Sequence, residues 1–211
     1  MEEFLKQALS HIPQFIARFV NLIIAPRATE TRAFAFDQYN IAGALAFFGI
    51  AMLVAQVLKA PMLPSAIPLV PHLAADAVWK MVVVLIEAVI IATVMRLIGN
   101  RFALGSLIVA NCYYFGALSV LSHLILLSGG QLINKSIAGV DVFYLYHLFG
   151  FGLIMLWMLL AWSAYAEFSE ISRGRAVLAL ALVCCASLPA LLFASLLRDA
   201  LVPRLYPHFH Y

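Results

Sequence analysis

The chain has 211 residues, of which 65% are hydrophobic and 11% charged, and its mean hydropathy is +1.01. A soluble domain carries about 45–50% apolar and about 25% charged residues, so at this length a soluble enzyme and a receptor with a folded ectodomain are excluded. The net charge is +3 and the 13 Lys and Arg residues stand singly, which argues against nucleic-acid binding. The composition predicts a polytopic, all-α protein whose solvent is the lipid bilayer.

Residues 1–38 contain no predicted span, but their apolar side chains follow a helical spacing. At 100° per residue, six of them share an arc of about 80°: Leu5, Leu9, Ile12, Ile16, Phe19 and Ile23. This pattern is typical of an amphipathic helix in the membrane interface, where Arg18 would contact anionic headgroups. Pro13 is equally compatible with two short helices, and a partner-binding helix is the functional alternative.

Hydropathy over windows of about 19 residues predicts five membrane spans. They cover residues 40–58, 78–98, 102–128, 142–165 and 176–197. Residues 39–198 are therefore expected to form a five-helix transmembrane bundle, and residues 199–211 a short tail. A turn of only three residues, 99–101, makes spans two and three an antiparallel hairpin. Four prolines between residues 61 and 71 predict an extended interfacial loop before the second span.

The distribution of basic residues predicts the orientation in the membrane. If the N-terminus is cytoplasmic, eight Lys and Arg residues lie inside and five outside, which is the bias that the positive-inside rule expects. Because the number of spans is odd, the C-terminus is then extracytoplasmic.

One acidic residue, Glu87 in VVVLIEAVII, lies deep in a predicted span. Such a group costs about 2.5–3.5 kcal/mol on insertion, so it is expected to turn inward and bond a neighbouring helix, and to be protonated near neutral pH. The polar face of the third span is its expected partner. The functional alternative is an ion or proton site on a translocation path.

The third span carries the other polar side chains of the candidate intramembrane site. Asn111 and Ser122 lie about 20° apart in helical projection and Tyr114 about 60° to the other side, while His123 is one residue off this face. Such a face either lines a cavity or joins the bundle by interhelical hydrogen bonds.

The sequence contains no motif of a catalytic, cofactor or metal site. G-x-S-x-G, H-E-x-x-H and phosphate-binding glycine loops are missing, and two histidines in the tail, His208 and His210, lack further zinc ligands. The three cysteines lie in apolar runs without a C-x-x-C pair. A non-enzymatic protein without cofactor or metal is therefore expected.

Two stretches carry a resemblance to a known family. The lead-in LIIAPRATETRAFAF places a proline and aromatic residues before the first span, and WSAYAEFSEISRGRAVLALALV joins the last two spans, with Ser172, Gly174, Arg175 and Ala176 in its turn. Between about Ala25 and Ala194 the chain resembles the bacterial branch of the Yip1 family. The resemblance implies a five-span fold with a cytoplasmic N-terminus in a bacterial inner membrane, and leaves the function open.

Two functions compete at this point. The first is a scaffold that organises membrane lipids, other membrane proteins or a second copy of the chain through the bundle surface and the N-terminal helix. The second is a small permease or channel for an ion, proton or small solute, centred on Glu87 and the polar face of the third span.

The predicted orientation is testable with topology reporters. A reporter fused after Tyr211 should read extracytoplasmic and one inserted at Asn100 cytoplasmic, because eight basic residues are held inside against five outside. The reverse pattern would invert every assignment of sides.

Overall fold

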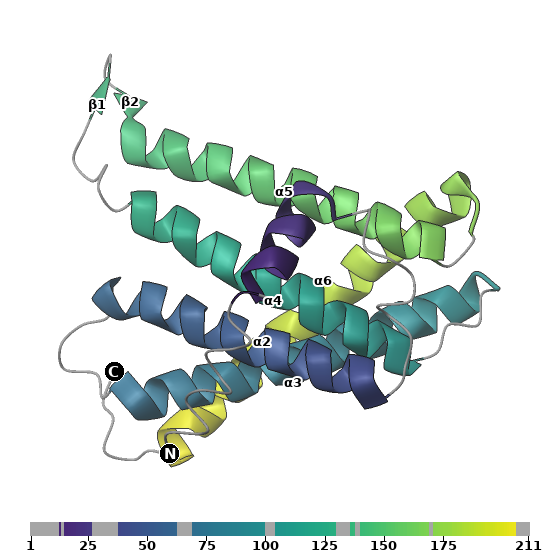
Figure 1. The fold of residues 1–211 in the computed structure, drawn as a ribbon, viewed down its shortest axis with the longest axis horizontal. Coiled ribbons are helices and arrows are strands. Elements are labelled where there is room, and N and C mark those ends of the chain that lie inside the picture. The colour runs from purple at the N-terminus through teal and green to yellow at the C-terminus, as the bar shows by residue number, and fades with distance from the viewer. Residues whose placement is uncertain are drawn as a thin grey trace.

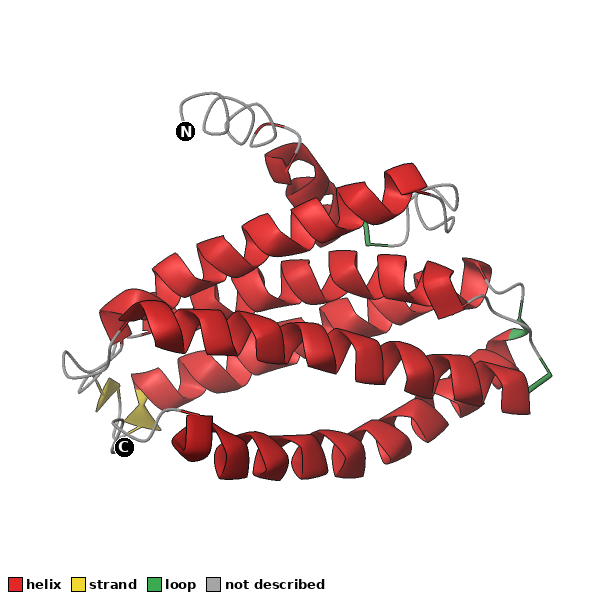
Figure 2. Cartoon of the chain, turned by 90° about the horizontal axis from the view of Figure 1, so that it is seen from below, coloured by secondary structure: helices red, strands yellow, loops and turns green. Residues whose placement is uncertain are grey.

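The computed structural model describes residues 13, 15–26, 38–62, 69–99, 104–129, 136–137, 140–168 and 171–205. Five long helices dominate it: α2 (Gln38–Lys59), α3 (Leu69–Leu97), α4 (Leu104–Gly129), α5 (Val142–Phe168) and α6 (Arg173–Leu205). The smaller elements are an N-terminal helix (Phe15–Ile24), the 3-10 turn η2 (Ala60–Met62) and an antiparallel pair of two-residue strands, β1 (Ser136–Ile137) and β2 (Val140–Asp141). The long helices form a bundle, as Figures 1 and 2 show.

Each long helix contains a stretch that is long and apolar enough to cross a membrane. These stretches are Asn40–Lys59, Val78–Leu97, Leu104–Gly129, Val142–Glu167 and Arg173–Leu196. They agree with the five predicted spans to within about three residues at each end, so the all-α, five-span class is confirmed.

The predicted loop before the second span is partly wrong. α3 begins at Leu69 and includes Pro71, so residues 69–77 are helical. A proline is tolerated in a first helical turn because the first backbone N–H groups of a helix have no partner within it. The helix therefore extends beyond its apolar stretch and carries Asp76 toward the end of α2.

α4 lies at the centre of the bundle and packs against α2, α3 and α5. In α4, 61% of the apolar stretch is buried. It packs tightly on α2 at Gly116, where an added Cβ would lie 3.1 Å from Phe47 Cε1 and 3.2 Å from Ala51 Cβ. Small residues allow helix backbones to approach in lipid, and Gly116 serves that purpose here.

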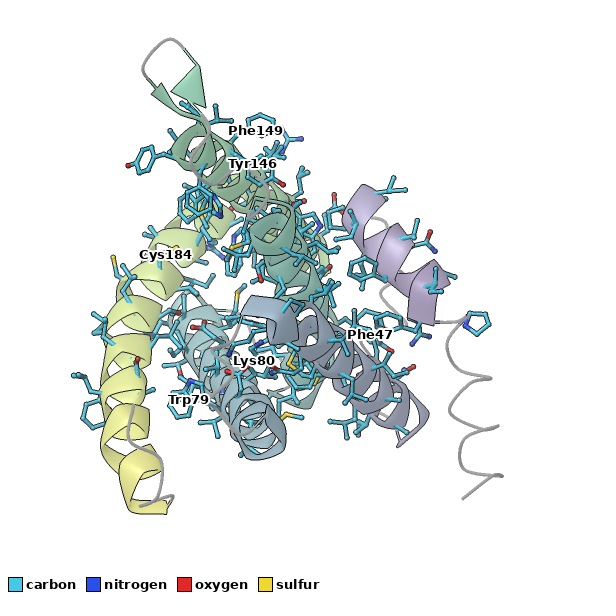
Figure 3. The ribbon with its side chains drawn as sticks, turned by 90° about the vertical axis from the view of Figure 1, so that its left-hand side faces the viewer. Phe47, Trp79, Lys80, Tyr146, Phe149 and Cys184 are labelled. Atoms are coloured by element: carbon cyan, nitrogen blue, oxygen red, sulfur yellow. The ribbon has the colours of Figure 1, made fainter. Side chains whose placement is uncertain are left out.

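α5 and α6 face outward over most of their surface. Only 11% of the apolar stretch of α5 and 17% of that of α6 are buried. Large apolar side chains such as Phe149 and Phe151 are exposed on α5, and Figure 3 shows Phe149 at the outer side of the bundle. This surface matches lipid or a partner in the membrane.

The N-terminal helix lies across the bundle, where Figure 1 shows it in purple. Phe15 and Leu22 are buried, Phe19 packs partly against the same core, and the Phe15 and Phe47 ring centroids are 4.9 Å apart. This buried stripe is rotated by about 70° from the predicted lipid-facing arc.

The predicted apolar arc is divided in the structure. Ile23 packs partly against the bundle with Phe19, whereas Ile16 is 53% exposed. Leu5, Leu9 and Ile12 lie outside the described residues. The difference arises because the sequence-based arc left out Phe15, whose ring packs against the bundle and sets the rotation of the helix.

The contact at Gly116 makes a prediction about stability. Gly116→Leu should lower the free energy of unfolding in detergent by about 1–3 kcal/mol, because the new side chain must displace Phe47 or Ala51. Gly49→Leu is the matched control, since nothing lies within 4 Å of a Cβ at that position. Equal stability of the two variants would contradict the close packing of α2 on α4.

Candidate functional site

The centre of the intramembrane site is Asn111 of α4, which is fully buried. Its Nδ2 donates to the backbone oxygen of Val84 in α3 at 3.3 Å, and its Oδ1 accepts from the hydroxyl of Tyr165 in α5. Both ends of the amide are thus paired, which a polar side chain needs when water is excluded. One side chain joins three helices.

Around Asn111, aromatic side chains connect the bundle to the N-terminal helix. The Tyr114 hydroxyl donates to the backbone oxygen of Pro26 at 2.9 Å, and Trp157 Nε1 donates to that of Leu22 at 3.0 Å. The Tyr114 ring centroid lies 5.3 Å from that of Tyr165 and 6.1 Å from that of Trp157. The last carbonyls of a helix lack partners within it, and here Trp157 of α5 supplies one for Leu22, while Tyr114 of α4 bonds the chain just after the helix.

Arg18, which the sequence predicts to contact lipid headgroups, is exposed and also bonds α4. Its guanidinium donates to the Tyr113 hydroxyl and lies 5.1 Å from the centroid of that ring. A guanidinium over an aromatic face is attracted by the electrons of the ring. The interaction therefore helps to hold the N-terminal helix on α4.

Glu87 is buried and bonded to another helix, but the predicted partner is wrong. Ser187 of α6 donates to Glu87 Oε2 at 2.8 Å, whereas the third span was expected to supply the contact. Val84 and Glu87 lie about 60° apart around α3. For this reason Val84 faces Asn111 of α4 while Glu87 faces α6.

The predicted polar face of α4 is divided by the structure. Asn111 and Tyr114 share the buried network described above. Ser122 and His123 are half-buried, and both bond the backbone oxygen of Ser119 in their own helix, at 3.1 Å and 2.7 Å. They lie more than two helical turns beyond Tyr114, and these bonds stay within α4.

A second polar cluster, which the sequence did not predict, lies where α2 ends and α3 begins. Asp76 Oδ2 accepts from Gln56 Nε2 at 2.6 Å, and Lys80 Nζ and Lys59 Nζ lie 3.4 Å and 3.6 Å from the same oxygen. Burial raises the pKa of Asp76, but the Gln56 hydrogen bond and the two ammonium charges outweigh it and hold that pKa below the ordinary 3.8. The carboxylate is ionised at neutral pH.

Several of these residues left signals in the sequence. Trp157, Ala161, Ala164 and Tyr165 have the spacing of one buried face of α5. In α6, Ser187 lies four and eight residues after the buried Val183 and Ala179, which is the spacing of one helix face. Asp76 and Lys80 are four residues apart, which is the spacing of an ion pair on one helix face. The pair was not recognised because this segment was predicted to be a loop.

Among the described residues, no group of three or more His, Cys, Asp and Glu side chains could hold a metal ion. No family model, curated protein or solved structure matches the chain. The Yip1 resemblance therefore stays a prediction from the sequence.

The Asn111 network predicts a measurable coupling. In a double-mutant cycle, Asn111→Leu and Tyr165→Phe should interact by about 0.5–1.5 kcal/mol in unfolding from detergent, because either change removes the hydrogen bond between the two side chains. Ser122→Ala combined with Tyr165→Phe should show no coupling, since Ser122 bonds its own helix. Purely additive effects of the first pair would show that the bond contributes nothing.

Proposed function

We propose that this integral membrane protein is a non-enzymatic scaffold, which organises partner proteins or lipids through its outer surface. The observation that supports this proposal is that polar groups in the interior form hydrogen bonds to other parts of the same chain. Asn111, Tyr114 and Trp157 bond other helices or the N-terminal helix of the same chain. These polar groups form hydrogen bonds that hold the helices together, as expected of a rigid scaffold.

The outward faces of α5 and α6 are the surface proposed to meet partners. They present large apolar side chains over two helices that are mostly exposed, while the N-terminal helix covers another part of the bundle. We further propose, from the basic-residue bias and the Yip1 resemblance, a bacterial inner membrane with the N-terminus inside. A second copy of the chain is one possible partner.

A permease is the second candidate, and one contact favours it. The Glu87–Ser187 hydrogen bond lies between α3 and the largely exposed α6. A displacement of α6 would separate the two side chains and uncover an intramembrane carboxyl group, the kind of group found on ion and proton pathways.

Flux measurements separate the two functions. Proteoliposomes containing the full chain should pass protons, Na⁺ and K⁺ no faster than protein-free liposomes, and Glu87→Gln should change nothing. Glu167→Gln, at the end of α5, is the matched charge control. A specific flux that Glu87→Gln abolishes and Glu167→Gln leaves intact would replace the scaffold by the permease.

The scaffold also makes a positive prediction. Photo-crosslinkers at Phe149 and Leu156, which are exposed on α5, should give discrete adducts in native membranes, and a crosslinker at the buried Val109 should give none. Adducts with lipid alone at both exposed positions would contradict protein partners on this face.

A further inference from the structure

The cluster between α2 and α3 contains two buried polar atoms that lack a hydrogen-bond partner among the described residues. These are Gln56 Oε1 and Lys80 Nζ. Gln56 itself is only 4% exposed, and Figure 3 labels Lys80 on α3 beside Trp79. Buried polar groups in native proteins are almost always paired, so two open ones side by side point to a missing group.

The open acceptor cannot be removed by turning the amide over. Asp76 is an ionised acceptor, so Gln56 must present Nε2 to it and keep Oε1 on the other side. Lys80 Nζ lies 3.4 Å from Asp76 Oδ2 and has three N–H donors, more than that one oxygen can satisfy. The cluster thus offers cationic donors and one neutral acceptor.

The charges of the cluster favour an anion. Lys59 and Lys80 both pair with Asp76, so these three groups together carry one net positive charge. His123 of α4 lies within electrostatic range of all three and adds no negative charge. Phosphate oxygens accept readily from ammonium groups, and a P–OH or neighbouring hydroxyl could donate to Gln56 Oε1.

The depth of the cluster indicates where such a phosphate comes from. Lys59 is the last residue of the apolar stretch of α2, and Lys80 is the third residue of the apolar stretch of α3. Both ammonium groups therefore lie at the boundary of the hydrocarbon layer, the level of lipid headgroups. Basic sites between helix ends at this depth are suited to anionic headgroups.

We propose that Lys80, Lys59 and Gln56 form a binding site for a phosphate group, supplied by an anionic lipid in the leaflet that faces the α2–α3 end of the bundle. Lys80 Nζ and Lys59 Nζ donate to the phosphate oxygens, and Gln56 Oε1 accepts a hydrogen bond from a hydroxyl group of the headgroup. Asp76 positions the two lysines. The site stands whether or not the protein acts as a scaffold.

The test uses the purified full chain in a nonionic detergent, with phosphatidic acid or phosphatidylcholine added separately and inorganic phosphate then added as a competitor. Native mass spectrometry counts the lipids retained, and competition by inorganic phosphate shows whether the free ion shares the site. We expect one phosphatidic acid per chain to be retained more strongly than phosphatidylcholine. Lys80→Met should weaken this binding about tenfold to a hundredfold, as loss of a charge-assisted hydrogen bond requires.

Matched variants make the result specific. Arg96→Met, an exposed basic residue at the other end of α3, should bind as the wild type, and Lys80→Arg should retain most of the affinity. Circular dichroism checks the fold of each variant. If Lys80→Met does not fold, Lys59→Met tests the same site from α2.

The outcomes are distinguishable. Equal retention of both lipids, equal losses in Lys80→Met and Arg96→Met, or unchanged binding in folded Lys80→Met would each overturn the site. Competition by inorganic phosphate that disappears in Lys80→Met would support the site and assign it to free phosphate as well. None of these results depends on flux or crosslinking, so the site and the scaffold can fail separately.

Discussion

The buried amide of Asn111 is the interaction on which the bundle depends. In a membrane every backbone and side-chain polar group must find its partner inside the protein, because no water is available. Asn111 meets this constraint with one bond to the backbone of α3 and one to Tyr165 of α5. α4 can therefore be the most polar span and still be the most buried.

The same constraint explains how the N-terminal helix is held. Trp157 bonds the carbonyl of Leu22 in this helix, and Tyr114 bonds the carbonyl of Pro26 just after it. The Tyr114 ring also lies beside the rings of Trp157 and Tyr165. The site and the docking of this helix are consequently one network. A change at Tyr165 would act on both. The hydrogen bond of Glu87 joins α3 to a different helix, α6.

The five spans could be predicted because their hydropathy depends only on local sequence, and Glu87 could be expected to point inward because lipid disfavours a carboxyl group. The partner of Glu87 could not be predicted, because packing between distant segments determines which side of α3 meets α6. The docked face of the N-terminal helix was missed for the same reason. Asp76 was missed because the prolines suggested a loop, although Pro71 in a first turn is compatible with a helix.

The bonds from Trp157 and Tyr114 also have a consequence for biogenesis. They join residues 135 and 88 positions apart, so the N-terminal helix is synthesised long before its docking surface exists. Until α5 has been inserted, the carbonyl of Leu22 lacks the indole of Trp157 and bonds water or headgroups at the membrane surface instead. An amphipathic helix is stable in such a place, so this segment stays at the interface and docks only after α5 is in place.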